Sequence, residues 1–261
     1  MANKGKYYES QFEEATIELL REAHWQYTFG DDIHRKYTDP LIEEDLRNFL
    51  AVQYKDKNLT TSEIDGIVAN LRNIGGQNDY YALRNAFLLY RDGYDFAYSD
   101  GRDNPFRLEY IDFKYPNHNV FRCVNQFVME QGRENRRPDI LLFINGIPVC
   151  IIELKNPTKQ NATIRDAHTQ ICTRYMRDIP ALLKYCALAV ISDGAKNALG
   201  TTYTPFEFFY EWKKIENEDK AGKGLDTLRT LIRGALSLER ILEILPVSYT
   251  HLRAHETKAN L

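Results

Sequence analysis

Cysteines are few and scattered in this sequence. Only four occur among 261 residues, without CxxC spacing: Cys123, Cys150, Cys172 and Cys186. A disulfide framework or a structural zinc site is therefore not expected. Such thiols are typical of a reducing compartment, so the sequence predicts a cytoplasmic protein.

Long apolar runs are also lacking. None reaches the roughly 18 to 20 residues that a membrane-spanning helix requires. The first residues, MANKGKYYESQFEE, become acidic at once and lack the apolar stretch of a signal peptide. We expect no membrane partner.

An excess of positive charge is missing as well. The formal net charge is −3, whereas a protein that binds DNA through its overall charge is usually strongly basic. Either nucleic acid is not the ligand, or it is bound locally with help from other domains or a metal ion. No G-x-x-x-x-G-K-[ST] phosphate loop occurs in the sequence, so the chain is not expected to hydrolyse ATP by itself.

The residues that are present divide into a helical first part and a strand-rich second part. Apolar spacing predicts helices over 7–22, 40–54, 62–74, 80–91, 162–176 and 225–245. Aromatic, β-branched and continuous apolar runs predict strands over 106–115, 119–129, 140–144, 148–154 and 186–192. This order is typical of an α/β core that follows a helical preface.

The segment RRPDILLFINGIPVCIIELKNPT, residues 136–158, carries the most chemical information. Asp139 starts one apolar strand, while Glu153 and Lys155 end the next. The turn signal Asn145-Gly146 predicts a hairpin that brings Asp139 beside Glu153, and strand alternation places Glu153 and Lys155 on one face. Two carboxylates are ligands that Mg²⁺ prefers. The ion would activate water and neutralise phosphate charge, while Lys155 would orient that water or stabilise the transition state.

The register of this hairpin is a test of the site. A plain two-residue turn at Asn145-Gly146 would place Asp139 opposite Ile152, on the face away from Glu153. The site therefore requires an odd loop, such as 145–147, or a β-bulge near Asp139. An exposed, ion-paired sheet edge is the alternative that the pattern leaves open.

Seven stretches resemble the N-terminal region of type I restriction enzyme motor subunits, over residues 7–244. They are YYESQFEEATIELL, LTTSEIDGIVANLRNI, LLYRDGYDF, YIDFKYPNHNVFRCVNQF, RRPDILLFINGIPVCIIELKNPT, AVISDGAKNALGT and FYEWK. The resemblance implies an α/β fold in which a helical N-terminal part precedes a PD-(D/E)XK restriction-endonuclease-like mixed sheet flanked by helices.

The same resemblance implies a Mg²⁺-dependent endonuclease module that cuts double-stranded DNA. Asp139 and Glu153 would be the metal ligands and Lys155 the catalytic lysine. Cleavage would be coupled to an ATP-driven motor domain that this sequence does not contain. The implied partners are the modification and specificity subunits of the restriction complex.

Related nucleases also place a glutamate on an early helix that faces the metal site. Glu13 is the best candidate, because it shares a helix face with Ile17 and Leu20. Glu9 or Glu14 in that role, with Glu13 an ordinary surface residue, is the alternative.

The family has a Gln-x-x-x-Tyr motif on the helix after the lysine. Here Gln170 and Tyr175 are one residue further apart. A regular helix would instead present Gln170 together with Arg174, unless a π-bulge absorbs the extra residue. Gln170 is therefore a candidate site residue, the role of Tyr175 is in doubt, and a solvent-facing amphipathic helix is the alternative.

Three arginines, Arg133, Arg136 and Arg137, precede Asp139 and could hold phosphates. A solvated charge cluster without such a role is the alternative.

The expected division of the chain has four parts. They are a helical part of the nuclease domain (1–105), the nuclease core (106–215), a linker and helix leading to a missing motor domain (216–245), and a tail (246–261). The tail contains PVSYTHLRAHET, which does not continue the helical pattern and resembles the translation of a transposon-end sequencing adapter. It is expected to contribute nothing to the fold.

Two other functions remain open. A stand-alone PD-(D/E)XK nuclease would not need the long helical preface. A non-catalytic DNA-binding or docking module of the same fold would not need Asp139, Glu153 and Lys155 together.

Overall fold

A mixed β-sheet forms the centre of the protein in a computed structural model that describes residues 2–155, 163–213, 215 and 224–259. The sheet has six strands in the order β1-β4-β7-β8-β9-β10. Their bounds are β1 (Gln26–Phe29), β4 (Phe121–Asn125), β7 (Ile140–Ile144), β8 (Ile147–Leu154), β9 (Leu188–Ser192) and β10 (Asn197–Gly200). Two small ribbons pair β2 (Tyr94–Phe96) with β3 (Phe106–Leu108), and β5 (Met129–Gln131) with β6 (Glu134–Arg136).

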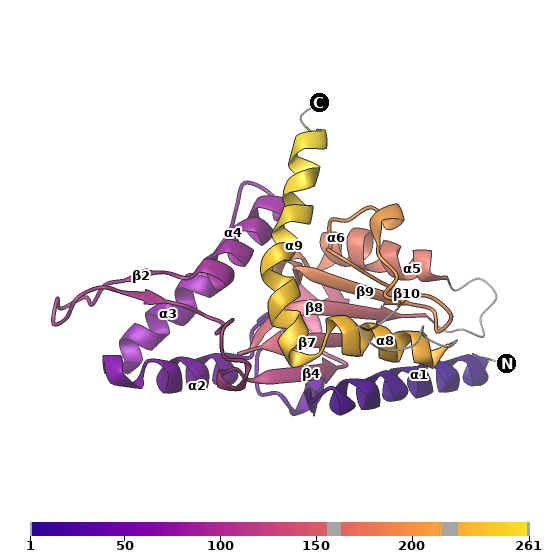
Figure 1. Cartoon of the computed structure of the whole chain (residues 1–261), viewed down its shortest axis with the longest axis horizontal. Helices are drawn as coiled ribbons and strands as arrows, with labels where there is room; N and C mark the ends of the chain where they lie inside the picture. Colours follow the sequence, from indigo (N-terminus) through magenta and orange to yellow (C-terminus); the bar gives the residue numbers. More distant parts are fainter. Residues whose placement is uncertain (1, 156–162, 214, 216–223, 260–261) are drawn as a thin grey trace.

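Helices flank this sheet (Figure 1). They are α1 (Ala2–Glu22), α2 (Glu43–Gln53), α3 (Thr61–Asn73), α4 (Asp79–Asp92), α5 (Ile164–Thr169), α6 (Met176–Asp178), α7 (Pro180–Leu183), α8 (Leu225–Ala235) and α9 (Leu238–Ala259). A π-helical segment, Gln170–Tyr175, joins α5 to α6. The expected α/β fold, with N-terminal helices before a mixed sheet flanked by helices, is confirmed and is consistent with a restriction-endonuclease-like architecture.

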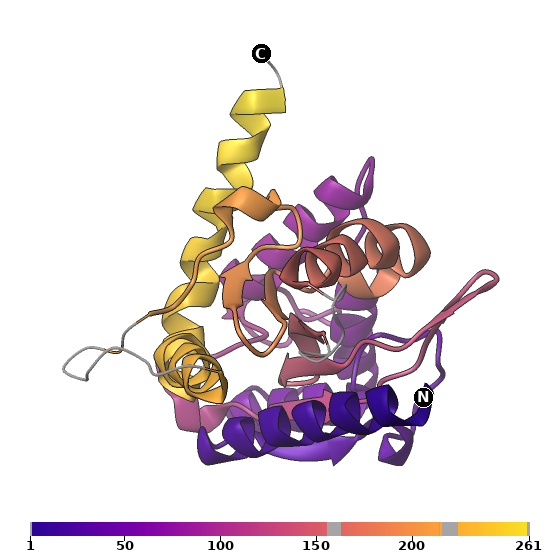
Figure 2. The same ribbon diagram turned by 90° about the vertical axis from the view of Figure 1, so that its right-hand side faces the viewer.

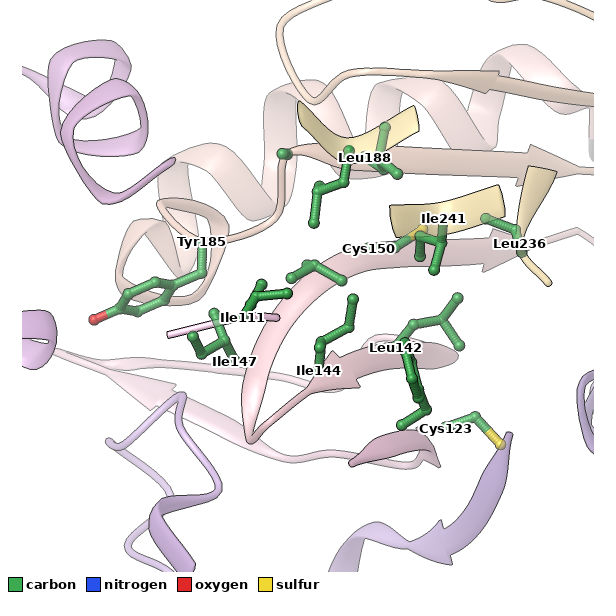
Figure 3. Close-up of a cluster of buried hydrophobic side chains, with 14 of the residues drawn as sticks. Ile111, Cys123, Leu142, Ile144, Ile147, Cys150, Tyr185, Leu188, Leu236 and Ile241 are labelled. Carbon is green, nitrogen blue, oxygen red and sulfur yellow. The ribbon is translucent and has the colours of Figure 1, made fainter. Parts of the chain in front are cut away.

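The two faces of the sheet bury alternate residues of each strand, as strand geometry requires. On one face Leu142, Cys150 and Leu188 pack against Leu236 and Ile241 from the end of the chain (Figure 3). On the other face Leu141, Ile151 and Ala189 pack against the layer that α5, the π-helical segment, α6 and α7 form. The predicted central strands are therefore buried on both sides.

The four predicted N-terminal helices are present as α1 to α4. Helix α3 begins after Thr60, whose Oγ1 accepts a hydrogen bond from the Glu63 backbone N–H at 3.2 Å, while the Glu63 carboxylate accepts one from the Thr60 N–H at 2.8 Å. This capping box satisfies two backbone donors at the start of the helix.

Two predicted strands are shorter than expected, and four strands, β1, β2, β6 and β10, cover residues for which no strand was predicted. Strand β3 covers only Phe106–Leu108 of the predicted 106–115, and it pairs with β2 outside the central sheet. Strand β4 covers Phe121–Asn125 of the predicted 119–129. Strand β1 pairs in parallel with β4 and lies within the part expected to be helical.

The predicted last helix, 225–245, is divided by a break at Leu236 and Ser237 into α8 and α9. The expectation that residues 246–257 do not continue a helix is wrong, because α9 runs through Pro246 to Ala259. Leu245 and Ser248 are buried on either side of the proline, and this packing offsets the hydrogen bond that proline cannot donate. Within the described part of the chain, no helix is long and apolar enough to cross a membrane.

Candidate active site

The hairpin of β7 and β8 sets the position of the candidate site. Asn145 and Gly146 have φ angles of 50° and 75°, as a two-residue type I′ turn requires, and Ile144 pairs with Ile147. The odd loop 145–147 is therefore wrong. Leu142 pairs with Cys150 but Phe143 pairs with Pro148, so β8 carries one extra residue, Val149.

This bulge restores the register that the site needs. Beyond it Ile140 pairs with Ile152, so Asp139 comes opposite Glu153 as the chain continues. The bulge alternative is therefore correct in kind, but it lies within β8 at Val149 and not near Asp139. The backbone N–H of Leu154 donates a 2.7 Å hydrogen bond to Oδ2 of Asp139 and fixes that carboxylate at the end of β8.

Glu153 is a buried carboxylate with an incomplete set of partners. Its side chain is only 1% exposed, and its Oε2 has no hydrogen-bond partner among the described residues. Burial, and then the nearby charge of Asp139, raise the pKa of Glu153 well above its usual range. Burying an ionised carboxylate here without a neutralising cation costs free energy. A cation between Glu153 and Asp139 would lower that cost.

Lys155 connects strand β8 with the π-helical segment through its ammonium group. Its Nζ donates hydrogen bonds to Glu153 Oε1 at 2.8 Å and to Gln170 Oε1 at 2.6 Å. The backbone N–H of Lys155 donates to the Ser192 carbonyl at 2.7 Å, so the neighbouring strand β9 supports this position. The ammonium is thus placed beside the Glu153 carboxylate, as strand alternation predicts.

The π-helical segment joins Tyr175 to this cluster. Gln170 Nε2 donates a 2.7 Å hydrogen bond to the Tyr175 hydroxyl. Burial, and then the charge of Glu153, raise the pKa of Tyr175. The pairing of Gln170 with Arg174 expected of a regular helix is wrong, since the wider π-helical turn brings Tyr175 back to the Gln170 face. Arg174 is exposed.

Glu13 lies at the same end of the sheet, but its carboxylate is held by amides. Oε1 of Glu13 accepts from Asn125 Nδ2 at 2.7 Å and from Gln126 Nε2 at 2.9 Å. Asn125 ends β4 and pairs with Ile140 on β7, which places Glu13 beside the strand that follows Asp139. These amides occupy the Glu13 carboxylate, and its expected role at the metal site stays a prediction.

The three arginines before Asp139 have different surroundings. Arg136 Nε donates to Oδ2 of the buried Asp178 at 2.8 Å, and Arg136 also pairs with Glu134. Arg133 and Arg137 are exposed. Arg136 therefore links β6 to α6 through its ion pair with Asp178.

Asp139 and Glu153 are the residues that would hold a divalent cation at this site. In the described ranges no three His, Cys, Asp or Glu side chains group closely enough to bind a metal by themselves. The protein therefore offers two candidate ligands, Asp139 and Glu153. Mg²⁺ commonly uses one or two carboxylates, and water and substrate phosphates complete its coordination. Oε2 of Glu153, which has no hydrogen-bond partner among the described residues, is available as a metal ligand.

Some members of the cluster have no clear signal in the sequence. The amides of Asn125 and Gln126 contact Glu13 only because β4 ends there and Gln126 adopts a φ of 56°. Asp178 lies beyond the predicted helix, and nothing in its local sequence indicates a partner. The extra residue between Gln170 and Tyr175 is the one visible signal, since it is the pattern that a π-bulge produces.

Comparison with known proteins identifies the region of a larger enzyme that the chain resembles. A family model described as the type I restriction enzyme R protein N terminus matches residues 6–208. The HindI endonuclease subunit of a type I restriction enzyme from Haemophilus influenzae is 29% identical over 90% of this chain and 23% of its own length. A Methanocaldococcus jannaschii protein named as the MjaIXP endonuclease subunit is 29% identical over 89% of this chain and 24% of its own.

A shorter match has the same description. The type I restriction enzyme EcoprrI endonuclease subunit of Escherichia coli is 31% identical over 59% of this chain and 45% of its own length. The chain spans about a quarter of the length of the first two relatives. Because the family model covers more than half of the residues, the chain belongs to the family of type I restriction enzyme R protein N-terminal regions.

Proposed function

We propose that the chain is the Mg²⁺-dependent DNA endonuclease module of a type I restriction-modification enzyme, and that it hydrolyses phosphodiester bonds in duplex DNA. The observation that carries the proposal is the convergence of Asp139, Glu153 and Lys155 at one end of β7 and β8. Two carboxylates and an ammonium on adjacent strands are the PD-(D/E)XK arrangement expected from the sequence.

Asp139 and Glu153 would hold the ion. Bound there, Mg²⁺ would supply charge neutralisation at the scissile phosphate and activation of water. The buried position of Glu153, without a partner on Oε2, supports a ligand role over a structural one. A surface ion pair at a sheet edge, the alternative for this motif, would leave both carboxylate oxygens in contact with solvent.

Lys155 has a chemical role in this proposal. Its ammonium is held by hydrogen bonds to Glu153 Oε1 and Gln170 Oε1. From there it can donate a hydrogen bond to the attacking water or to a phosphate oxygen on which charge develops.

Gln170 and Tyr175 orient that lysine. Gln170 Nε2 donates to the Tyr175 hydroxyl, so its Oε1 is the atom that faces Lys155. The amide can accept from the ammonium in only this orientation. Gln170 is thus a positioning residue for Lys155, and the Tyr175 hydroxyl accepts a hydrogen bond from its Nε2.

The wider assembly is also part of the proposal. The relatives are named as endonuclease subunits of type I restriction enzymes and are about four times as long as the matched region. We infer that duplex cleavage is coupled to an ATP-driven translocase outside this chain, and that modification and specificity subunits are its partners in the cytoplasm.

Plasmid cleavage tests the proposal. The chain is assayed alone and joined to its motor domain in a complex reconstituted with modification and specificity subunits, with Mg²⁺ or with EDTA. Cleavage that requires Mg²⁺ and is lost in Asp139→Asn supports the proposal. A reconstituted complex that translocates DNA without cutting it, or that cuts equally well with Asp139→Asn, contradicts it.

A further inference from the structure

The β5–β6 hairpin projects from the body of the domain (Figure 2). Met129 pairs with Arg136 and Gln131 with Glu134, in a ribbon separate from the central sheet. Strand β6 ends three residues before Asp139. The hairpin and the carboxylate therefore share one continuous segment of backbone.

The hairpin is held to the body at several points along its length. The Glu130 N–H donates to the Tyr37 carbonyl at 2.9 Å, and the Ala181 N–H donates to Gln131 Oε1 at 3.0 Å. Arg136 binds Asp178, whose side chain is only 2% exposed. These contacts tie both strands of the ribbon to the body, so its direction relative to the site is set.

The charges of the hairpin are not all used in these contacts. Arg136 pairs with Glu134 and Asp178, and Glu130 accepts a hydrogen bond from Asn135 at 3.2 Å. Arg133 at the turn and Arg137 after β6 are exposed. Neither makes an ion pair or side-chain hydrogen bond with the residues that the structure describes.

The exposed part of the hairpin is polar and offers no apolar surface for a protein partner. Gly132 adopts a φ of 62°, which allows the tight turn that presents Arg133. Met129, the one large apolar residue of the ribbon, is fully buried. The exposed part of the hairpin is therefore polar, with two guanidinium groups that lack partners in the described chain.

We propose that the β5–β6 hairpin is an arm that grips the sugar–phosphate backbone of duplex DNA beside the cleavage site, with Arg133 and Arg137 contacting phosphates. The inference rests on the proposed nuclease function. Guanidinium groups bind phosphate oxygens with directed, charge-assisted hydrogen bonds. Three residues in each strand give a ribbon about 10 Å long, and a two-stranded ribbon fits the major groove of B-DNA, which is about 12 Å wide.

The arm also accounts for DNA binding by a chain without overall positive charge. The net charge of −3 gives no general attraction to DNA. Arg133 and Arg137 on the hairpin supply a local attraction for DNA beside the cleavage site. Arg136, which has the same side chain but is committed to Asp178, is not expected to contact DNA.

Fluorescence anisotropy with a labelled 30-base-pair duplex, at low salt and in EDTA, tests the arm in the full chain. Replacing both residues, Arg133→Ala with Arg137→Ala, should raise Kd roughly tenfold. The slope of log Kobs against log salt should fall in magnitude by about 1.8, which is 0.9 for each phosphate that the arm no longer neutralises. Lys55→Ala, which removes an exposed charge in the α2–α3 connection, is the matched control and should leave both values unchanged.

The outcomes separate this inference from the nuclease proposal. If the double variant binds the duplex with the wild-type Kd and salt slope, or if the wild-type chain does not bind the duplex, the arm is wrong. If binding depends on the two arginines but the reconstituted complex never cuts, the arm stands and the nuclease proposal fails. Both residues are exposed, so an unchanged melting temperature should show that the variants are folded.

Discussion

Gln170 and Tyr175 contact each other across five positions of one helix, with a 2.7 Å hydrogen bond between Nε2 and the hydroxyl. In a regular α-helix, positions five apart point about 140° away from each other. The π-helical segment Gln170–Tyr175 widens the turn and removes this difference. One inserted residue is thereby absorbed where it would otherwise separate Tyr175 from the Lys155 cluster.

Deleting Thr173 should therefore be tolerated. Thr173 is exposed within the π-helical segment, and its removal gives the Gln-x-x-x-Tyr spacing that a regular α-helix places on one face. We expect a melting temperature within a few degrees of the wild type and retained cleavage in the reconstituted complex. Inserting one alanine after Thr173 is the control and should abolish cleavage. A deletion variant that no longer folds would show that the wide turn is itself required.

Lys155→Ala should abolish cleavage while DNA binding and ATP hydrolysis by the reconstituted complex continue. The variant removes the ammonium that Glu153 and Gln170 hold, and the fold should survive because a proton can neutralise the buried Glu153. Lys155→Arg should also be poor, since a planar guanidinium does not replace a compact ammonium. Translocation, ATPase and cleavage assays on the same preparation make the comparison. Cleavage at the wild-type rate would remove Lys155 from the chemistry.

The central strands and the three charged residues were predictable from the sequence for a physical reason. Strands β7, β8 and β9 are buried on both faces, so they appear as continuous apolar runs. A charged residue that ends such a run is conspicuous. Asp139, Glu153 and Lys155 could therefore be located. Asp139 accepts a hydrogen bond from the Leu154 N–H, next to Glu153, and Lys155 donates one to Glu153.

Other features depend on contacts that local sequence does not encode. Strand β1 has mostly exposed side chains, so it lacks the alternation of a half-buried strand, and it is held by parallel pairing with the distant β4. The bulge at Val149 settles the register after the turn, yet valine has no special turn preference. The path of α9 beyond Pro246 depends on the burial of Leu245 and Ser248.

Acid should remove the stabilising contact between Glu63 on helix α3 and Arg102. The hydrogen bond from Arg102, and then that from Thr60, lower the pKa of Glu63 from 4.5 to about 2. A carboxyl group whose pKa is lower in the folded than in the unfolded state stabilises the fold at pH values above its unfolded-state pKa. This contribution is lost as the pH falls through its folded-state pKa. The wild type should therefore lose its advantage over Glu63→Gln between pH 4.5 and about 2.

Thermal unfolding of both proteins across this range measures the difference. Arg102→Gln should have a similar effect, and the double variant should cost less than the sum because the two side chains form one contact. A difference between wild type and Glu63→Gln that stays constant from pH 6 to pH 2 would mean that the Arg102 contact does not stabilise the ionised carboxylate.

Glu153→Gln should separate the stability of the site from its function. In the metal-free protein the buried Glu153 carboxylate has the Lys155 ammonium as its ion-pair partner and also experiences the charge of Asp139. Replacing one carboxylate by a neutral amide of the same shape balances these charges and removes a buried group that is costly to ionise. The melting temperature of Glu153→Gln in EDTA should therefore equal or exceed that of the wild type.

Added Mg²⁺ should reverse this order. An ion that binds only the folded protein stabilises it by about 2.7 kcal/mol at 100 times its Kd, so the melting temperature of the wild type should rise by several degrees. Glu153→Gln and Asp139→Asn should show little or no rise, and calorimetry should find their affinity for the ion greatly reduced. Lys114→Ala, which removes a charge in the loop that follows the buried Asp112, is a control that should respond to Mg²⁺ like the wild type. Equal stabilisation of all four proteins by Mg²⁺ would place the ion elsewhere, because both carboxylates are required if the cation lies between them.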